Sequence, residues 1–262
     1  IRSTRTILNS QFDQFKMPEA ICLGEALVDR LGPLGGDPLV DAQVEDRQGG
    51  APANVACGLA KLGTKSAFCG RLGNDSIGNS FQNLFQLREV NCVGLQVDQV
   101  RPSRIVLVRR DLDGERTFEG FVGDSGEGYA DQFFSVEDLM LQWPLLARQT
   151  CYLLVGTIPL ATSHSAEAFK WSVDKAFKSN IQIVVDINWR PTFWDLNNSP
   201  DTNPNNSQLE EIFPILEKAS LLKLAKEEAL CFFNSSNPKD ISSSLPKKPD
   251  VVVTDGGNPL HW

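Results

Sequence analysis

The sequence predicts an α/β protein in which a mostly parallel sheet is covered by helices on both faces. Short apolar runs typical of buried strands alternate with segments of helical periodicity along most of the chain. The strand-like runs are residues 21–23, 67–69, 151–155, 181–185 and 251–253. Such alternation is typical of βαβ units, whose helices connect parallel strands and cover the sheet.

Helices are expected between these strands, where apolar residues recur every three or four positions. Residues 51–62 follow this spacing, with Pro52 at a favourable start and Gly63 at a favourable end. The same spacing predicts helices at residues 77–85, 169–177 and 209–216. The sequence contains no internal repeat and no separate second domain.

Two segments interrupt the alternation. Residues 30–48 are polar, contain glycine and proline, and are too irregular for a core helix. Residues 104–122 predict a β-hairpin with a turn at Asp113 and Gly114. We expect both segments to lie outside the main sheet.

Composition and charge restrict the class of function. The 262 residues carry a net charge of −8, which disfavours nucleic-acid binding because phosphate backbones are held mainly by Lys and Arg. No apolar run approaches the ~20 residues that cross a bilayer. The six cysteines show no Cys-x-x-Cys spacing, which indicates reduced thiols in an intracellular protein, in the cytoplasm or the plastid stroma. Residues 1–17 are consistent with a disordered extension or with the remnant of a transit peptide.

The most specific motif lies at residues 49–63. Gly49 and Gly50 predict a tight turn in which backbone N–H groups can approach a ligand closely. Asn54 falls on the polar side of the helix that follows, where its amide can donate and accept hydrogen bonds. This arrangement suits a polyhydroxylated small molecule.

The same segment resembles the N-terminal motif of the PfkB (ribokinase-like) carbohydrate kinases. The positions in register are Gly49, Gly50, Pro52, Asn54, Ala56 and Gly63, followed by Gly73. Residues 22–29 are similar to the fructokinase-like branch of that family. The resemblance implies a ribokinase-like three-layer sandwich over residues 18–262, with a small antiparallel β lid formed by the segments near 30–48 and 104–122.

A sugar site follows from this resemblance and from the position of Asp29. Asp29 stands just beyond the first strand, and ligands of open α/β sheets bind outside the carboxyl ends of the strands. The resemblance implies that Asp29, Gly49, Gly50 and Asn54 hold the sugar, and that Arg104 in the lid hairpin reaches over it. It also implies that the lid can form a homodimer surface, and a role as a subunit of a larger complex stays open.

A nucleotide site is expected where the strand at 181–185 ends. Asp186, Asn188 and Arg190 alternate on an extended segment, so their side chains project to the same side and can hold hydrated Mg²⁺ and triphosphate oxygens. The resemblance implies ATP and Mg²⁺ as cofactors, and it admits a monovalent cation. It also implies that Glu228 acts on Mg²⁺ through water, as Asp186 does, and that Thr254 and Gly256 bind phosphates.

Three departures from the family pattern leave two hypotheses open. Ala225 replaces a family asparagine, and Pro259 stands where a second glycine is usual. The family's Gly-Ala-Gly-Asp motif, which carries the catalytic base, is not found before Trp262. We therefore expect no catalytic residue in this chain and little activity from it alone. The protein is either an ATP-dependent kinase of a small, fructose-like sugar or a non-catalytic fructokinase-like subunit of a larger assembly.

Overall fold

A seven-stranded parallel sheet forms the main body of the protein within residues 17–123 and 128–262, which the computed structural model describes. The strand order is β11-β10-β9-β8-β1-β4-β5, and every neighbouring pair runs parallel. The strands are β1 (Ala20–Leu23), β4 (Ser66–Gly73), β5 (Leu95–Asp98), β8 (Tyr152–Val155), β9 (Gln182–Asp186), β10 (Leu221–Ala225) and β11 (Asp250–Thr254). The predicted parallel sheet is confirmed. Apart from Met17, the expected N-terminal extension lies outside the described residues.

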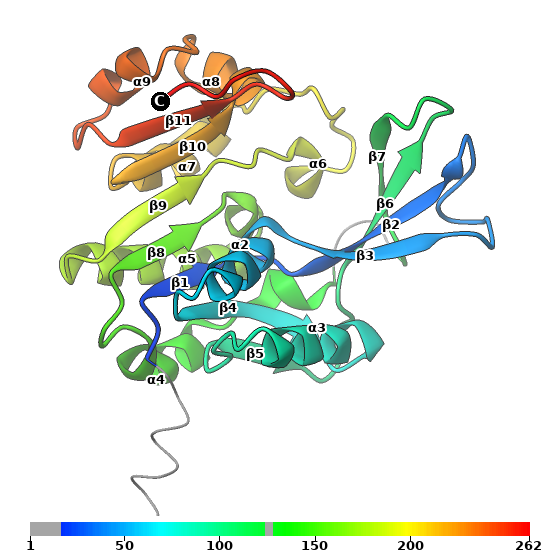
Figure 1. The fold of residues 1–262 in the computed structure, drawn as a ribbon, viewed down its shortest axis with the longest axis horizontal. Coiled ribbons are helices and arrows are strands. Elements are labelled where there is room, and N and C mark those ends of the chain that lie inside the picture. The colour runs from blue at the N-terminus through cyan, green and yellow to red at the C-terminus, as the bar shows by residue number, and fades with distance from the viewer. Residues whose placement is uncertain (1–16, 124–127) are drawn as a thin grey trace, which may run out of the picture.

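Helices cover both faces of this sheet, as the sequence predicts (Figure 1). On one face, Phe81 and Phe85 pack against Cys22 and Phe68. On the other, Phe169 belongs to the largest apolar cluster, together with β1 and β8 residues. The helices on these faces are α2 (Ala51–Lys61), α3 (Ser76–Leu87), α4 (Val136–Leu146) and α5 (Ser163–Lys178). Successive strand residues point to opposite faces, so one strand supplies both clusters.

The remaining helices follow the edge strands and the connections. They are α6 (Pro191–Trp194), α7 (Asn206–Leu216), α8 (Lys226–Phe233) and α9 (Pro238–Ser244), with two 3₁₀ turns, η1 (Ala130–Phe133) and η2 (Ile158–Ala161). Helix α7 confirms the prediction at residues 209–216, whereas α4, α8 and α9 and the strands β5 and β10 were not predicted. Within the described ranges, no helix combines the length and apolar character needed to cross a membrane.

A second sheet, here called the small sheet, stands beside the main body in the order β3-β2-β6-β7 (Figure 1). Its strands are β2 (Leu27–Leu34), β3 (Glu45–Gly49), β6 (Ile105–Arg110) and β7 (Arg116–Phe121). The predicted hairpin at 104–122 is confirmed. The expectation of an antiparallel lid is corrected in one respect, because β2 pairs parallel with β6. Strand β2 is the first arm of the β2–β3 hairpin, and β6 is the first arm of the β6–β7 hairpin. Both first arms leave the main body in the same direction, so their pairing is parallel.

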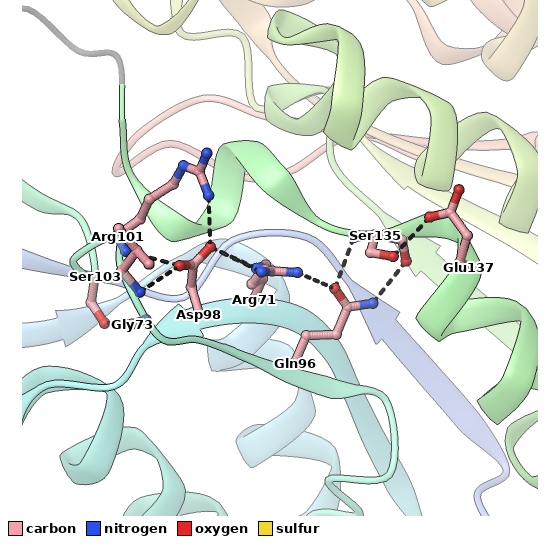
Figure 2. A network of polar contacts seen from close by, with 9 residues as sticks. Arg71, Gly73, Gln96, Asp98, Arg101, Ser103, Ser135 and Glu137 are labelled. Atoms are coloured by element: carbon pink, nitrogen blue, oxygen red, sulfur yellow. Dashed lines mark hydrogen bonds and ion pairs between the residues drawn. The ribbon is translucent and has the colours of Figure 1, made fainter.

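A buried polar network fixes the chain just before β6 (Figure 2). The Asp98 side chain is 2% exposed and accepts hydrogen bonds from the Arg71 Nε (3.0 Å) and from the backbone N–H groups of Val100 (2.9 Å) and Arg101 (2.8 Å). Burial alone would raise the pKa of this carboxyl, but the backbone donors and Arg71 lower it to about 2. Gln96 exchanges two 2.8 Å hydrogen bonds with the backbone of Ser135. The network therefore anchors the segment that leads into the small sheet.

Candidate active site

One open cleft of about 460 Å³ lies between the small sheet and the carboxyl ends of the main strands. Five residues that the sequence analysis placed in two separate sites line it together: Asp29, Gly50, Asn54, Asn188 and Arg190. Strand β2 supplies the first, the start of α2 the next two, and the segment after β9 the last two. The fold thus brings the sugar-site motif and the exit of β9 to the same cavity.

The paired glycines are required by close backbone approach. Gly50 has φ +95°, and a Cβ there would lie 2.5 Å from the Glu25 carbonyl oxygen. A Cβ on the buried Gly49 would lie 2.8 Å from Oδ2 of Asp29. The Gly50 carbonyl accepts from the N–H of Asn54 (2.9 Å), which begins the helix and leaves the Asn54 side chain exposed. Larger residues would displace the Asp29 carboxylate or the turn.

Asp29 presents a half-buried carboxylate to the cleft. Burial raises its pKa, and the positive charges of Arg116 and Arg190 oppose that rise. Arg116 and Arg190 line the same cavity. The carboxylate can therefore accept hydrogen bonds from ligand hydroxyls while two cations face the same space.

Glu25 is a site residue that sequence reasoning missed. Its side chain is 2% exposed, and its Oε1 accepts from the backbone N–H of Ala51 (3.1 Å) at the start of α2. Its Oε2 is buried without a hydrogen-bond partner among the described residues. Burial, and to a smaller extent the charge of Asp131, raise its pKa to about 7, against the opposing effects of the backbone N–H groups of Glu25 and Ala51 and of the charge of Arg190. The only sequence signal was its place beside Asp29 in residues 22–29.

Arg104 occupies a different position from the one expected. Its side chain is 3% exposed and does not line the cleft. Its Nε and Nη2 donate to the two carboxylate oxygens of Asp131, at 2.8 and 3.0 Å. The guanidinium therefore does not reach over the cavity, and Phe193 lines the cleft on that side.

The segment after β9 is held by Glu228. Its Oε1 accepts from the N–H of Trp189 (2.7 Å), and its Oε2 from the N–H of Ala225 (2.7 Å), which also caps α8. Burial raises its pKa, and these backbone donors oppose the rise. Asn188 adopts φ +44°, a conformation that asparagine tolerates, and it lines the cleft. Glu228 thereby positions Asn188 and the exposed Arg190.

Two ion pairs occupy the carboxyl ends of β9, β10 and β11. Asp186 Oδ1 lies 3.0 Å from the Nζ of Lys223, and Lys226 Nζ lies 2.9 Å from Oδ2 of Asp255. The Thr254 hydroxyl donates to the Leu224 carbonyl (3.3 Å). Gly256 is exposed with φ +54°, and the space around its Cα is open. Asp186, Glu228, Thr254 and Gly256 thus lie at or just after the ends of three neighbouring strands, and none of the four lines the cleft.

The comparison with known families decides the class of the protein. A model of the pfkB family carbohydrate kinases matches residues 17–262. The chain belongs to the pfkB family. Among curated members, it is 29% identical over 254 residues to the probable chloroplastic fructokinase-6 of Arabidopsis thaliana and 32% identical over 215 residues to the fructokinase of Salmonella typhimurium. These alignments cover 95% and 82% of this chain, and 62% of the length of each relative.

Solved pfkB structures share the fold. The fructokinase of Vibrio cholerae, in its form with fructose, ADP and calcium bound, is 26% identical, with a TM-score of 0.73 over 93% of this chain and 72% of that one. The fructokinase of Xylella fastidiosa with bound ATP is 25% identical, with a TM-score of 0.73 over 94% of this chain and 75% of that one. The ribokinase-like α/β fold and the fructokinase-like branch are therefore confirmed.

The carboxylates near the cleft show whether this protein could bind a divalent metal ion. No group of three His, Cys, Asp or Glu side chains within the described ranges is placed to hold a metal. Both carboxylate oxygens of Glu228 already accept backbone hydrogen bonds, whereas Asp186 keeps one oxygen beyond its Lys223 pair. These residues do not fit a metal bound by protein side chains alone. The remaining oxygen of Asp186 fits a hydrated ion, whose bound water a carboxylate can accept from.

Proposed function

We propose that this protein binds a small fructose-like sugar and ATP in the cleft and belongs to a kinase that transfers the γ-phosphoryl group to a primary hydroxyl of the sugar. The observation that carries the proposal is the shared cavity of Asp29, Gly50 and Asn54 with Asn188 and Arg190. The fructokinase names of its relatives support the substrate class. In this proposal residues 18–262 form one kinase domain, residues 1–17 precede it, and the small sheet is the lid.

The sugar is held at the start of α2. Asp29 accepts hydrogen bonds from two hydroxyls, and Asn54 donates to and accepts from a third. Gly49 and Gly50 allow the turn to pass close to Asp29 and Glu25, because a Cβ at either position would collide with them, and the turn thereby keeps Asp29 and the start of α2 together around the sugar. Charge-assisted hydrogen bonds of this kind contribute about 1.5–3 kcal/mol each, enough to select a polyhydroxylated ligand.

The nucleotide phosphates lie on the other side of the cleft. Arg190 offers a planar fork to phosphate oxygens, and Asn188 donates its amide. Thr254 and the open backbone at Gly256 would face the distal part of the nucleotide. Asp186 would meet hydrated Mg²⁺, which supplies neutralisation of the phosphate charge, and Glu228 keeps the 188–190 segment in place. Phosphoryl transfer depends mainly on such positioning and electrostatic stabilisation. We assign binding and positioning roles to these residues.

Binding measurements test this proposal without requiring turnover. Calorimetric titration of the full chain with fructose and, separately, with ATP and Mg²⁺ should give saturable binding of both. Asp29→Asn should weaken fructose binding at least tenfold and leave ATP binding unchanged, and Arg190→Gln should do the reverse. Asp113→Asn, at the exposed tip of the β6–β7 hairpin, removes the same charge outside the cleft and should change neither. Absence of binding by fructose, other small sugars and ATP would refute the proposal.

A non-catalytic role in a larger assembly is the second candidate. Ala225, at the carboxyl end of β10, offers no side-chain amide to a nucleotide, and Lys223 already pairs with Asp186. Such a protein would show no nucleotide-dependent shift of its melting temperature and would co-purify with stoichiometric partners, or as a homodimer through the small sheet.

The six cysteines, all within the described ranges, are free thiols, which supports an intracellular location in the cytoplasm or the plastid stroma.

A further inference from the structure

We propose that Arg104 is a positioning residue that sets the aromatic wall shared by the sugar side and the phosphate side of the cleft. This inference rests on the proposed function. It assigns Arg104 a role that acts through Phe193 and does not require contact between Arg104 and the sugar.

The first step concerns the burial of the charge. A guanidinium that is 3% exposed is costly unless its donors and its charge are matched. The two hydrogen bonds to Asp131, whose side chain is 9% exposed, provide that match in a fork geometry that lysine cannot reproduce. The backbone at Ser103 is fixed as well, because its N–H and hydroxyl donate to Asp75 at 2.6 and 2.9 Å. Arg104 is therefore held rigidly from both ends.

The second step concerns the rings around this cation. The guanidinium carbon lies 4.7 Å from the ring centre of Phe121, 4.5 Å from that of Tyr129 and 4.9 Å from that of Phe193. The first ring ends β7, the second precedes η1, and the third belongs to α6. These separations are within the range of cation–π attraction, which strengthens when the site excludes water. One buried charge thus joins the small sheet to a segment of the main body.

The third step connects this cluster to the cleft. Phe193 lines the cavity, and so does Phe118 on the small sheet, with 6.2 Å between the two ring centres. Phe193 also packs edge-on against Phe121, with ring centres 4.9 Å apart. Helix α6 lies between the main body and the small sheet (Figure 1). The position of Phe193 therefore determines how the small sheet meets the cavity.

The fourth step extends the effect to the phosphate side. Phe193 lies three residues after Arg190, and its N–H donates to the Arg190 carbonyl (3.0 Å) in a single helical turn. Displacing the Phe193 ring would therefore shift the backbone that presents Arg190 to the cavity. Loss of Arg104 should weaken sugar and ATP binding together. Asp29→Asn and Arg190→Gln should each weaken one of them.

The test compares Arg104→Met with the matched control Arg101→Met in the full chain. Arg101 belongs to the same segment, pairs with Asp98 at 3.3 Å, and its guanidinium carbon lies 3.4 Å from the ring centre of Phe133. It therefore makes the same kinds of contact, an ion pair and a cation–π contact, outside the cluster, from a side chain that is 35% exposed. Arg104→Met should lower the affinities for fructose and for ATP each about tenfold, and Arg101→Met should change both by less than about twofold. Arg104→Lys should restore only part of the loss, because it keeps the charge without the fork.

Circular dichroism checks that each variant is folded, and a second variant separates the loss of Arg104 from the exposure of an unpaired charge. The single substitution leaves Asp131 buried without its cation, so R104M/D131N is measured beside it. A folded R104M/D131N protein that binds fructose and ATP as tightly as the unaltered chain would overturn the inference and leave the proposed function standing. An unaltered chain that binds neither ligand would overturn both. Loss of fructose binding alone would also contradict the inference, since the shared wall requires both affinities to fall.

Discussion

Replacing Glu25 by glutamine should make the protein's stability less dependent on pH. The Glu25 side chain is 2% exposed, its Oε1 accepts from the Ala51 N–H, and its Oε2 has no partner among the described residues. Burial raises its pKa from the ordinary 4.5 to about 7. In the unfolded chain the carboxyl ionises near 4.5, whereas in the folded protein it keeps its proton up to about pH 7.

The sign and the size follow from these two values. Folding is favoured most below pH 4.5, where both states are protonated, and this contribution is lost as the pH rises through about 7. The interval of about 2.5 pH units corresponds to about 3 kcal/mol, at 1.36 kcal/mol for each unit. Between pH 5 and pH 8 the free energy of unfolding of the unaltered protein should therefore fall by about 2–3 kcal/mol relative to Glu25→Gln, which cannot ionise.

Urea denaturation at pH 5, 6, 7 and 8 measures this difference directly. Other titrating groups contribute equally to both proteins and cancel when the two free energies are subtracted. Glu217→Gln, at the exposed end of α7, is the control for the loss of a surface carboxylate. A difference for Glu25→Gln that does not change between pH 5 and pH 8 would refute the reasoning, because it would mean that Glu25 ionises alike in the folded and unfolded chain.

Three further predictions follow from backbone geometry, charge and packing. Gly50→Ala should lower the free energy of unfolding by about 1–3 kcal/mol and abolish fructose binding, since its Cβ would meet the Glu25 carbonyl at φ +95°; unchanged urea midpoints and titrations would contradict this. Asp98→Asn should cost about 2 kcal/mol at pH 7. Because its pKa is lowered to about 2, the stabilisation is present above the ordinary 3.8 and disappears as the pH falls through 2, so the two urea curves should converge there. Phe169→Ala should cost about 3–5 kcal/mol, because the ring is fully buried, whereas Phe177→Ala on the same helix, 41% exposed, should cost far less; equal shifts in thermal unfolding would count against that difference.

The local parts of the candidate site could be predicted because their chemistry lies in short stretches of sequence. A Gly-Gly turn before a helix is determined by the missing Cβ atoms at Gly49 and Gly50, and the structure shows the backbone contacts that require them. Asp186 could be placed at a strand end because the apolar run before it ends there, and it is the last residue of β9. Asp29 was expected just beyond the first strand, but it lies within β2 of the small sheet. Their roles toward sugar and nucleotide remain proposals.

Arg104 and Glu25 show what such reasoning could not reach. Arg104 stands next to a predicted hairpin, and its sequence position does not reveal that Asp131 and three rings enclose it. In the sequence, nothing distinguishes Glu25 from any other acidic residue next to a strand. Its unpartnered oxygen depends on which side chains the fold brings against it. Burial and pairing are properties of contacts between distant segments, and a single sequence does not contain them.

The sequence by itself determined five of the seven strands of the parallel sheet, the helices α2, α3, α5 and α7, the hairpin at 104–122 and the motif that marks the family, because periodicity and turn chemistry act over a few neighbouring residues. The tertiary structure alone decided that β2 pairs parallel with β6, that Glu228 supports the 188–190 segment, and that a buried arginine joins the small sheet to α6. These features depend on how separate elements meet in space. The hydrogen bonds and charge contacts involved join groups far apart along the chain, and they are stronger inside the protein than in water because the fold excludes water around them.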